Sequence, residues 1–423
     1  MPQLRIAYIC FDIVPAPKGA AVHIAAFAQT LAAAFSEIHL VTVSPTTERI
    51  DSREIYPGVI QTMLPVAGDT LIHRVMSFRH LLLEWLRERR FDVVQIRSVY
   101  EGWKIAVKKK QYCDHLIFEV NGLPSIELKY RYPAVADDRE LLHKLRTQEQ
   151  ICLEAADLIV TPSGVTKEHL QTRGVASEKI CVIPNGVDLN IFTYREPSAS
   201  ASGVERINFS SPASSASPAS QPLEMLYFGT LSAWQGVNLA VEALELVNRD
   251  IRANLTAIAQ ARNHQIQALK QLASKLKVAD KLTILEPMSQ KQLVENIHAA
   301  DVILAPLTPN DRNLVQGCCP LKILEGMATG IPVITSDLPV VREIGIDQEH
   351  FLLVKSGSAK AIKDAVLRLH QDKDLTTQLV ANARKRIEDR YTWKHAGEAL
   401  IAAYLLHFLL GFLGVLAVFN PYS

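Results

Sequence analysis

The residues that are best suited to chemistry lie in one short segment, 317–334. Pro320 can occupy the first turn of a helix, because that position needs no amide donor, and Gly330 suits the end of the same helix. Lys322 and Glu325 are three residues apart and therefore share one helix face. A helix N-terminus gathers unpaired N–H groups and partial positive charge, which favours a bound phosphate. A lysine in this turn opposes the helix dipole, so a bound anion would explain its presence.

Spacing alone leaves two interpretations of this pair open. In a binding site, Lys322 would meet a phosphate and Glu325 would accept hydrogen bonds from the two hydroxyls of a ribose. On a protein surface, the same two residues would form an ordinary ion pair worth roughly 0.2–0.5 kcal/mol. The spacing by itself favours the surface pair.

The segments around this motif alternate between apolar runs and helical patterns. Arg5–Cys10 is a β-prone run, and it is followed by a glycine-bearing loop, a helical pattern over 21–35 and a second apolar run. This order predicts a parallel βαβ unit. Strands are predicted at 38–43, 91–96, 116–120, 157–161, 180–183, 223–228, 255–259, 282–285, 302–305 and 332–335. Further helices are predicted at 141–155, 237–248, 359–369 and 375–390.

The alternation predicts an α/β protein made of two doubly wound domains in tandem. The expected boundaries are 1–190 for the first domain, 191–222 for a linker, 223–390 for the second domain, and 391–423 for a C-terminal helix and tail. The linker is rich in Ser, Pro and Ala and has too few apolar residues to offset its ordering entropy, which predicts a flexible insertion. Open α/β sheets bind ligands beyond the carboxyl ends of their strands, so a ligand is expected in a cleft between the domains.

Composition argues against several other classes of protein. The 423 residues are 48% apolar and 21% charged, which is ordinary globular usage and enough for two or three domains. Lys plus Arg (45) nearly balances Asp plus Glu (44), so the basic footprint of a nucleic-acid-binding protein is absent. The six cysteines form no CxxC pair, which argues against a zinc ribbon. No strand is followed by the G-x-G-x-x-G motif of a dehydrogenase.

Four segments, taken in their order along the chain, resemble the retaining, nucleotide-sugar-dependent glycosyltransferases of family 4, which are of the GT-B type. The run Pro-x-Lys-x-x-Glu-x-Met-Ala-x-Gly-x-Pro-Val, which begins at Pro320, resembles their donor-binding signature. Residues 156–163 and 179–188 resemble signatures of the first domain, and 227–236 resembles the opening of the second. The resemblance implies two Rossmann-like domains that face each other across a cleft. It also implies sugar transfer from a nucleotide sugar to a polysaccharide or glycolipid with retention of configuration, and without a metal or other cofactor.

The resemblance also implies roles for single residues. Glu325 matches the carboxylate that binds the donor ribose, Lys322 stands where a cation could meet the donor diphosphate, and Gly19 matches a glycine whose backbone approaches the donor. The implied donor site comprises Gly19, Gly229, Gly236, Arg312, Pro320, Lys322 and Glu325. The residues expected to take part in catalysis are Glu325, Lys322 and Asn121.

The sequence departs from the family pattern in two ways that concern the donor. The first glutamate of the family's Glu-x7-Glu pair falls at Gly317, which has no side chain. The phosphate-binding Arg and Lys of the second domain's first loop are absent from 232–236, so Arg312 or Lys322 would have to replace them. The identity of the donor stays open. A non-catalytic homologue, which binds a nucleotide sugar or partners another transferase, stays open as the alternative.

The expected acceptor side offers weaker signals. Asn121 follows a strand in a segment where relatives place an active-site histidine or asparagine, and a turn-forming Asn-Gly pair explains it equally well. Arg97, Lys18 and His23 are further acceptor-side candidates. Each has a structural alternative: a satisfied arginine, an exposed loop lysine and a core-edge histidine.

The C-terminal residues 399–419 carry no formal charge, and about 20 apolar residues suffice to cross a bilayer. Lysines and arginines at 385–394 precede them, which would keep the enzyme cytoplasmic under the positive-inside rule. The last helix is expected to pack on the first domain over 398–404. Residues 405–419 are expected to associate with the inner face of the cytoplasmic membrane.

Overall fold

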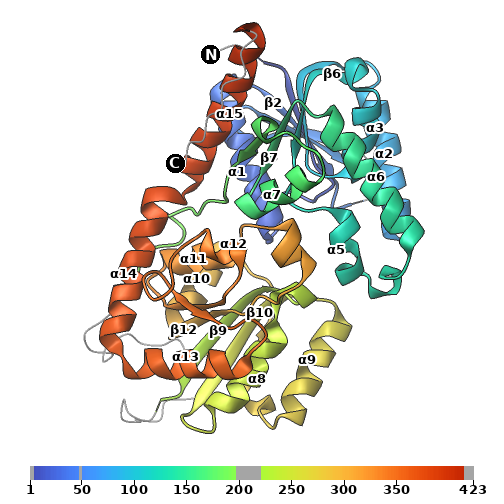
Figure 1. Cartoon of the computed structure of the whole chain (residues 1–423). Coiled ribbons are helices and arrows are strands. Elements are labelled where there is room, and N and C mark those ends of the chain that lie inside the picture. The colour runs from blue at the N-terminus through green and yellow to red at the C-terminus, as the bar shows by residue number, and fades with distance from the viewer. Residues whose placement is uncertain (1–3, 47–49, 197–220, 414–423) are drawn as a thin grey trace. The chain divides into compact units, whose positions relative to one another are not determined.

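The computed structural model describes residues 4–46, 50–196 and 221–413, with side chains through Phe408. The chain, coloured by residue number from blue to red in Figure 1, divides into two compact units. The first unit comprises 1–185, 314–319 and 393–423, and the second comprises 186–313 and 320–392. The assignment of 314–319 to the first unit is a feature that the sequence pattern does not indicate.

The described strands of the first unit form one sheet in the order β3-β4-β2-β1-β5-β6-β7-β8. Neighbouring strands run parallel, except that β3 is antiparallel to β4. The strands are β1 (Ile6–Ile9), β2 (Ile38–Val43), β3 (Asp51–Tyr56), β4 (Val59–Leu64), β5 (Phe91–Ile96), β6 (Cys113–Glu119), β7 (Leu158–Thr161) and β8 (Ile180–Val182). The helices are α1 (Gly19–Phe35), α2 (Leu71–Leu86), α3 (Val99–Val107), α4 (Lys109–Tyr112), α5 (Pro124–Arg131), α6 (Arg139–Ala155), α7 (Gly164–Thr172) and α15 (Trp393–Leu413).

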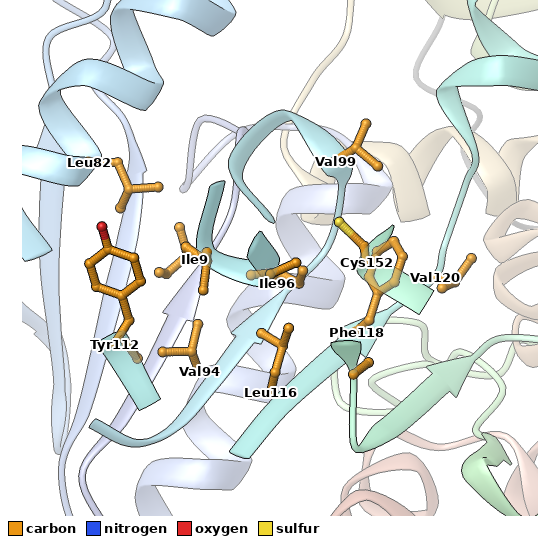
Figure 2. Close-up of a cluster of buried hydrophobic side chains, with 14 of the residues drawn as sticks. Ile9, Leu82, Val94, Ile96, Val99, Tyr112, Leu116, Phe118, Val120 and Cys152 are labelled. Atoms are coloured by element: carbon orange, nitrogen blue, oxygen red, sulfur yellow. The ribbon is translucent and has the colours of Figure 1, made fainter. Parts of the chain in front are cut away.

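Helices cover both faces of this sheet, which explains why its central strands are continuous apolar runs. Along β1, Ile6 and Tyr8 pack toward α1 and α15, whereas Ala7 and Ile9 pack toward α2, α3 and α6. Figure 2 shows the second of these clusters, where side chains of β5 and β6 meet helix residues. Because most strands are parallel, their carboxyl ends meet at one rigid edge of the sheet.

The described strands of the second unit form a fully parallel sheet in the order β11-β10-β9-β12-β13-β14. The strands are β9 (Leu223–Thr230), β10 (Ala253–Gln260), β11 (Leu282–Leu285), β12 (Val302–Ala305), β13 (Val333–Ser336) and β14 (Leu352–Val354). The helices are α8 (Val237–Val247), α9 (Asn263–Lys275), α10 (Gln290–Ala299), α11 (Leu321–Ala328), α12 (Pro339–Arg342), α13 (Ala359–Gln371) and α14 (Lys373–Arg390). Helices α8, α9 and α13 pack on one face, and α11 packs against β12 and β13 on the other.

The strand order of the second sheet reverses between β9 and β12. The chain runs outward from β9 through β10 to β11 and then returns to the other side of β9. Such a switch point leaves a crevice at the carboxyl ends of the two strands, where ligands of doubly wound folds bind. The prediction of two doubly wound α/β domains is confirmed.

The sequence prediction missed the hairpin of β3 and β4 and the short strand β14. Strand β3 is partly exposed and mostly polar, because it lies at the edge of its sheet, so it has no apolar run. Gly58 makes the turn with a φ of 74°, and a Cβ there would lie 2.4 Å from the carbonyl oxygen of Ser36. Strand β14 has three residues, too few to show a period.

Helix α15 packs along α1 further than the sequence predicts. Ala399, Leu400 and Tyr404 are buried there, and Leu405 and Phe408, which lie beyond the expected end at 404, also pack against this core. The remaining side chains of the apolar tail lie outside the described residues, as do residues 197–220 of the expected linker. No helix within the described ranges is long and apolar enough to cross a membrane.

Candidate active site

The donor-side pair stands at the start of α11. Pro320 is the N-cap of this helix, one position earlier than the expected first turn, and Lys322 lies in the first turn. Lys322 is 7% exposed, and its Nζ atom has no hydrogen-bond partner among the described residues. The same atom lies 4.1 Å from the centre of the Tyr227 ring. The pair is therefore not a solvated surface ion pair.

Gly229 brings the backbone of β9 close to this ammonium. Its φ is 134°, and a Cβ at this position would lie 3.2 Å from the Nζ of Lys322. Gly229 stands near the carboxyl end of β9, the strand at which the sheet order reverses. Lys322 is thus directed to the switch point of the second sheet, where a ligand is expected.

The electrostatics of Lys322 and Glu325 are coupled. Burial lowers the pKa of Lys322 to about 7, and the nearby Glu325 carboxylate opposes that shift. Burial raises the pKa of Glu325 to about 7, and Lys322 opposes that shift in turn. A buried ammonium without a hydrogen-bonded acceptor is costly, so an anion bound beside it would be stabilised.

The loop that follows β9 is shaped by a required glycine. Gly236 has a φ of 70°, and a Cβ there would lie only 1.8 Å from the carbonyl oxygen of Pro306. Arg312 lies over the ring of Trp234 in this loop, at 4.9 Å from the ring centre, and donates to Asn313 Oδ1 at 3.0 Å. Asn313 donates in turn to the carbonyl oxygen of Trp234 at 2.9 Å. Arg312 is therefore held against the loop from which the family's phosphate-binding cations are missing.

The position of the family's first glutamate is closed to any side chain. Gly317 has a φ of 82°, and a Cβ there would lie 2.5 Å from Thr166 Oγ1 and 2.6 Å from Ser163 Oγ. Ser163 caps the N-terminus of α7. The segment 314–319 therefore lies against α7 within the first unit, and glycine at 317 is a steric requirement.

The acceptor-side candidates of the first unit gather around a residue that the sequence prediction missed, Glu119. This side chain is 1% exposed at the carboxyl end of β6. Its carboxylate meets Tyr8 Oη at 2.6 Å, Gln95 Nε2 at 2.7 Å, Arg97 Nε at 2.7 Å, His23 Nε2 at 2.8 Å and the Nδ2 of Asn121. The guanidinium of Arg97 and the ring of His23 hold the pKa of Glu119 well below its usual range, although burial opposes them. The sequence signal that could have identified Glu119 is its position as a charged residue at the end of a buried apolar strand.

The structure brings Arg97, His23 and Asn121 together, and it gives the two basic residues structural partners. Lys18 forms a separate ion pair with Asp12 at 2.5 Å, and Asp12 also lies 3.4 Å from Arg97. These contacts agree with the structural alternatives for Arg97 and His23. The side-chain amide of Asn121 donates to Glu119, which orients it.

Two of the expected site residues, His23 and Gly19, lie on helix α1. His23 Nδ1 lies 2.7 Å from Asn185 Oδ1. Gly19, expected in a loop, is the first residue of α1 and so presents a helix N-terminus. Within the described ranges, no group of three or more His, Cys, Asp or Glu side chains has the arrangement of a metal site.

Comparison with known families assigns each half of the chain. Residues 17–191 match the model of Glycosyltransferase Family 4, and residues 213–386 match that of Glycosyl transferases group 1. D-inositol 3-phosphate glycosyltransferase of Xylanimonas cellulosilytica is 23% identical over 401 residues, 91% of each chain.

Solved structures share the fold at low sequence identity. Sucrose-phosphate synthase from Thermosynechococcus elongatus has a TM-score of 0.74 at 20% identity, over 96% of this chain and 100% of that one. HepE from Anabaena in complex with UDP-glucose has a TM-score of 0.68 at 14% identity, over 95% of this chain and 99% of that one. The chain belongs to the glycosyltransferases of the GT-B fold, with a family 4 domain followed by a group 1 domain.

Proposed function

We propose that the protein transfers a sugar from a nucleotide-sugar donor to a polysaccharide or glycolipid acceptor, with retention of configuration and without a metal or other cofactor. The observation that carries this proposal is Lys322. Its buried ammonium lies at the switch point of the second sheet, beside Gly229 and on the same helix face as Glu325. A nucleotide sugar would present a diphosphate to the ammonium and a ribose diol to the carboxylate.

In the proposed reaction, the bond between the sugar and the diphosphate breaks and negative charge develops on the leaving group. Lys322 and the N-terminus of α11 would stabilise that charge in place. An oxygen of the departing diphosphate would take the proton of the acceptor hydroxyl, and the acceptor oxygen would bond to the anomeric carbon on the face that the diphosphate leaves. Asn121, with its amide held by Glu119, would hydrogen-bond the reacting sugar.

A donor panel followed by thermal shift tests this function. UDP-, GDP- and ADP-linked sugars are expected to raise the melting temperature unequally, because binding to the folded state stabilises it. UDP-glucose comes first in the panel, since the HepE structure holds it. Glu325→Ala should reduce the best shift, whereas Glu295→Ala, at an exposed position on α10, should leave it unchanged. Absence of a shift with every donor would contradict the proposal.

A non-catalytic homologue is the second candidate, and one observation favours it. The closed position at Gly317 leaves the chain without the family's first glutamate. Release of nucleoside diphosphate separates the two candidates. An enzyme releases it from at least one donor and loses that release in Glu325→Ala. A binding homologue shifts in melting temperature without releasing it in either protein.

We further propose that the enzyme works in the cytoplasm at the inner face of the membrane, attached through residues 409–419, since Leu405 and Phe408 pack on the first unit. Truncation after Phe408 keeps the described packing of α15 on α1 and removes the rest of the tail. The full chain should fractionate with membranes and the truncated chain should not. Equal fractionation of the two would exclude the tail as the anchor.

A further inference from the structure

The loop that joins β6 to α5 and carries Asn121 is held by a side chain from a distant part of the sequence, Gln316. This side chain is fully buried and belongs to the segment 314–319 of the first unit. Its Oε1 accepts from the backbone amide of Leu123 at 2.9 Å, and its Nε2 donates to Glu127 Oε1 at 2.9 Å. Leu123 is the N-cap of α5, and Glu127 lies in the first turn of that helix.

We propose that Gln316 is a positioning residue for sugar transfer, which fixes the loop 120–123 so that the Asn121 amide meets the reacting sugar. The inference rests on the proposed function, because it deepens the role that Asn121 has there. Gln316 itself would touch neither donor nor acceptor, since its side chain is buried and both ends of its amide bond to groups of the protein.

Asn121 is held from both ends of its loop. At the β6 end, its side-chain amide donates to Glu119, whose carboxylate also accepts from Arg97 Nε at 2.7 Å. At the α5 end, the amide of Leu123 precedes the first turn and therefore has no acceptor within the helix, so Gln316 supplies one. A buried N–H without an acceptor is costly, and loss of Gln316 would therefore favour a displaced loop.

The second hydrogen bond of Gln316 acts on the same loop. Gly122, the residue directly after Asn121, packs against the Glu127 carboxylate so closely that a Cβ would lie 2.8 Å from Oε1. The same Oε1 accepts from Gln316 Nε2. Gln316 thus fixes the carboxylate that borders Gly122 as well as the amide that ends the loop.

A positioning side chain must itself be held, and the chain that follows Gln316 is held within the first unit. The next residue, Gly317, packs so closely on α7 that a Cβ would lie 2.5 Å from Thr166 Oγ1. Two residues further on, the carbonyl oxygen of Cys319 accepts from Asn185 Nδ2 at 2.6 Å. Gln316 therefore reaches the Asn121 loop from a backbone that is fixed by its own contacts.

A double-mutant cycle on the full chain tests the inference. The rate measured is release of nucleoside diphosphate, with water as the acceptor, from whichever of UDP-, GDP- and ADP-glucose gives the largest thermal shift. Gln316→Met removes both hydrogen bonds at a similar side-chain length, and should lower kcat by about tenfold while KM for the donor stays within about twofold. In an Asn121→Ala background the same substitution should have no further effect, because Gln316 acts through Asn121.

An exchange of partners provides a rescue. Gln316→Glu keeps an acceptor for Leu123 but sets a second carboxylate against Glu127, so it should also lower kcat. Adding Glu127→Gln supplies the amide from the other side of the same bond, and the double variant should recover most of the wild-type kcat. Gln267→Met, at an exposed position on α9, is the matched control and should leave kcat unchanged.

The outcomes separate the inference from the proposed function. Equal losses from Gln316→Met in the wild-type and Asn121→Ala backgrounds would overturn the inference alone, because the residue would then support only the fold. Unchanged kcat in Gln316→Met would do the same, as would failure of the exchanged pair to recover. No release from any of the three donors by the wild type would overturn both.

Discussion

Glu119 and Lys322 are both buried charges, but their surroundings are opposite. Five neighbouring side chains contact the carboxylate of Glu119, and the pKa of Glu119 is lowered accordingly. Lys322 meets an aromatic face and no hydrogen-bond acceptor among the described residues, and its pKa is lowered by burial. The charge of Glu119 therefore stabilises the fold, whereas the charge of Lys322 is suited to binding an anion.

Glu101 gives the first prediction at the residue scale. Its Oε1 accepts from the amides of Arg97 and Ser98 at 2.9 and 2.6 Å, while its buried Oε2 has no partner among the described residues. Burial raises the pKa of Glu101 to about 8. The folded state thus keeps a proton that the unfolded state has released, so the free energy of unfolding falls as pH rises from about 4.5 through 8.

Urea unfolding at pH 6 and pH 8.5 measures this effect. Glu101→Gln cannot ionise, and it should remove about 2 kcal/mol of the loss of stability between the two pH values. Glu88→Gln, at an exposed position, should not. Parallel pH profiles for Glu101→Gln and the wild type would mean that Glu101 is already ionised at pH 6.

The second residue-scale prediction concerns Gly317. Gly317→Ala should cost more stability than Gly174→Ala, because both positions have positive φ (82° and 84°), but a Cβ at 174 meets nothing within 4 Å. The difference in melting temperature between the two variants isolates the clash with Ser163 and Thr166. Gly317→Glu should lower the melting temperature further and should not increase donor turnover. A stable Gly317→Glu protein with increased turnover would contradict the steric account.

At the scale of elements, α15 is held in the first unit by packing and by a buried hydrogen bond from Tyr404. Gly397 allows close approach to α1, where a Cβ would lie 2.8 Å from Thr30 Oγ1. Tyr404 donates its hydroxyl to Gln95 Oε1, and the amide of Gln95 donates to Glu119. The C-terminal helix therefore supports the same network that orients Asn121.

Tyr404→Phe tests this support. The substitution leaves Gln95 Oε1 without that donor, so it should lower the free energy of unfolding in urea by about 1–3 kcal/mol. Tyr56→Phe, on the partly exposed strand β3, is the matched control and should cost less. Equal losses in the two variants would show that the bond from α15 adds nothing measurable.

The sequence was sufficient to predict elements that have a strong local signal. Buried parallel strands are continuous apolar runs, so β1, β9 and β12 could be located, and the spacing of Lys322 and Glu325 placed both on one helix face. Partners brought together by the fold have no local signal. The orphaned state of Lys322 depends on Tyr227 and Gly229, which are distant in sequence, and the contacts of Glu119 come from several strands and helices.

At the scale of the whole molecule, both halves use the same architecture for different purposes. Each unit gathers its polar side chains at the carboxyl ends of parallel strands, where doubly wound folds bind ligands. In the first unit these polar groups are extensively paired, and in the second a cation that meets no hydrogen-bond acceptor in the described part of the chain stands at the switch point. This difference favours donor binding by the second unit.

Donor turnover followed by proton NMR tests the central claim most directly, because it reports release of nucleoside diphosphate and the anomeric configuration of the sugar in one sample. The wild type should release diphosphate from at least one of the UDP-, GDP- and ADP-linked sugars, with product of unchanged configuration. Glu325→Ala should lose about tenfold or more of that rate. Equal rates in Glu325→Ala and the wild type, inverted product, or no turnover of any donor would contradict the account.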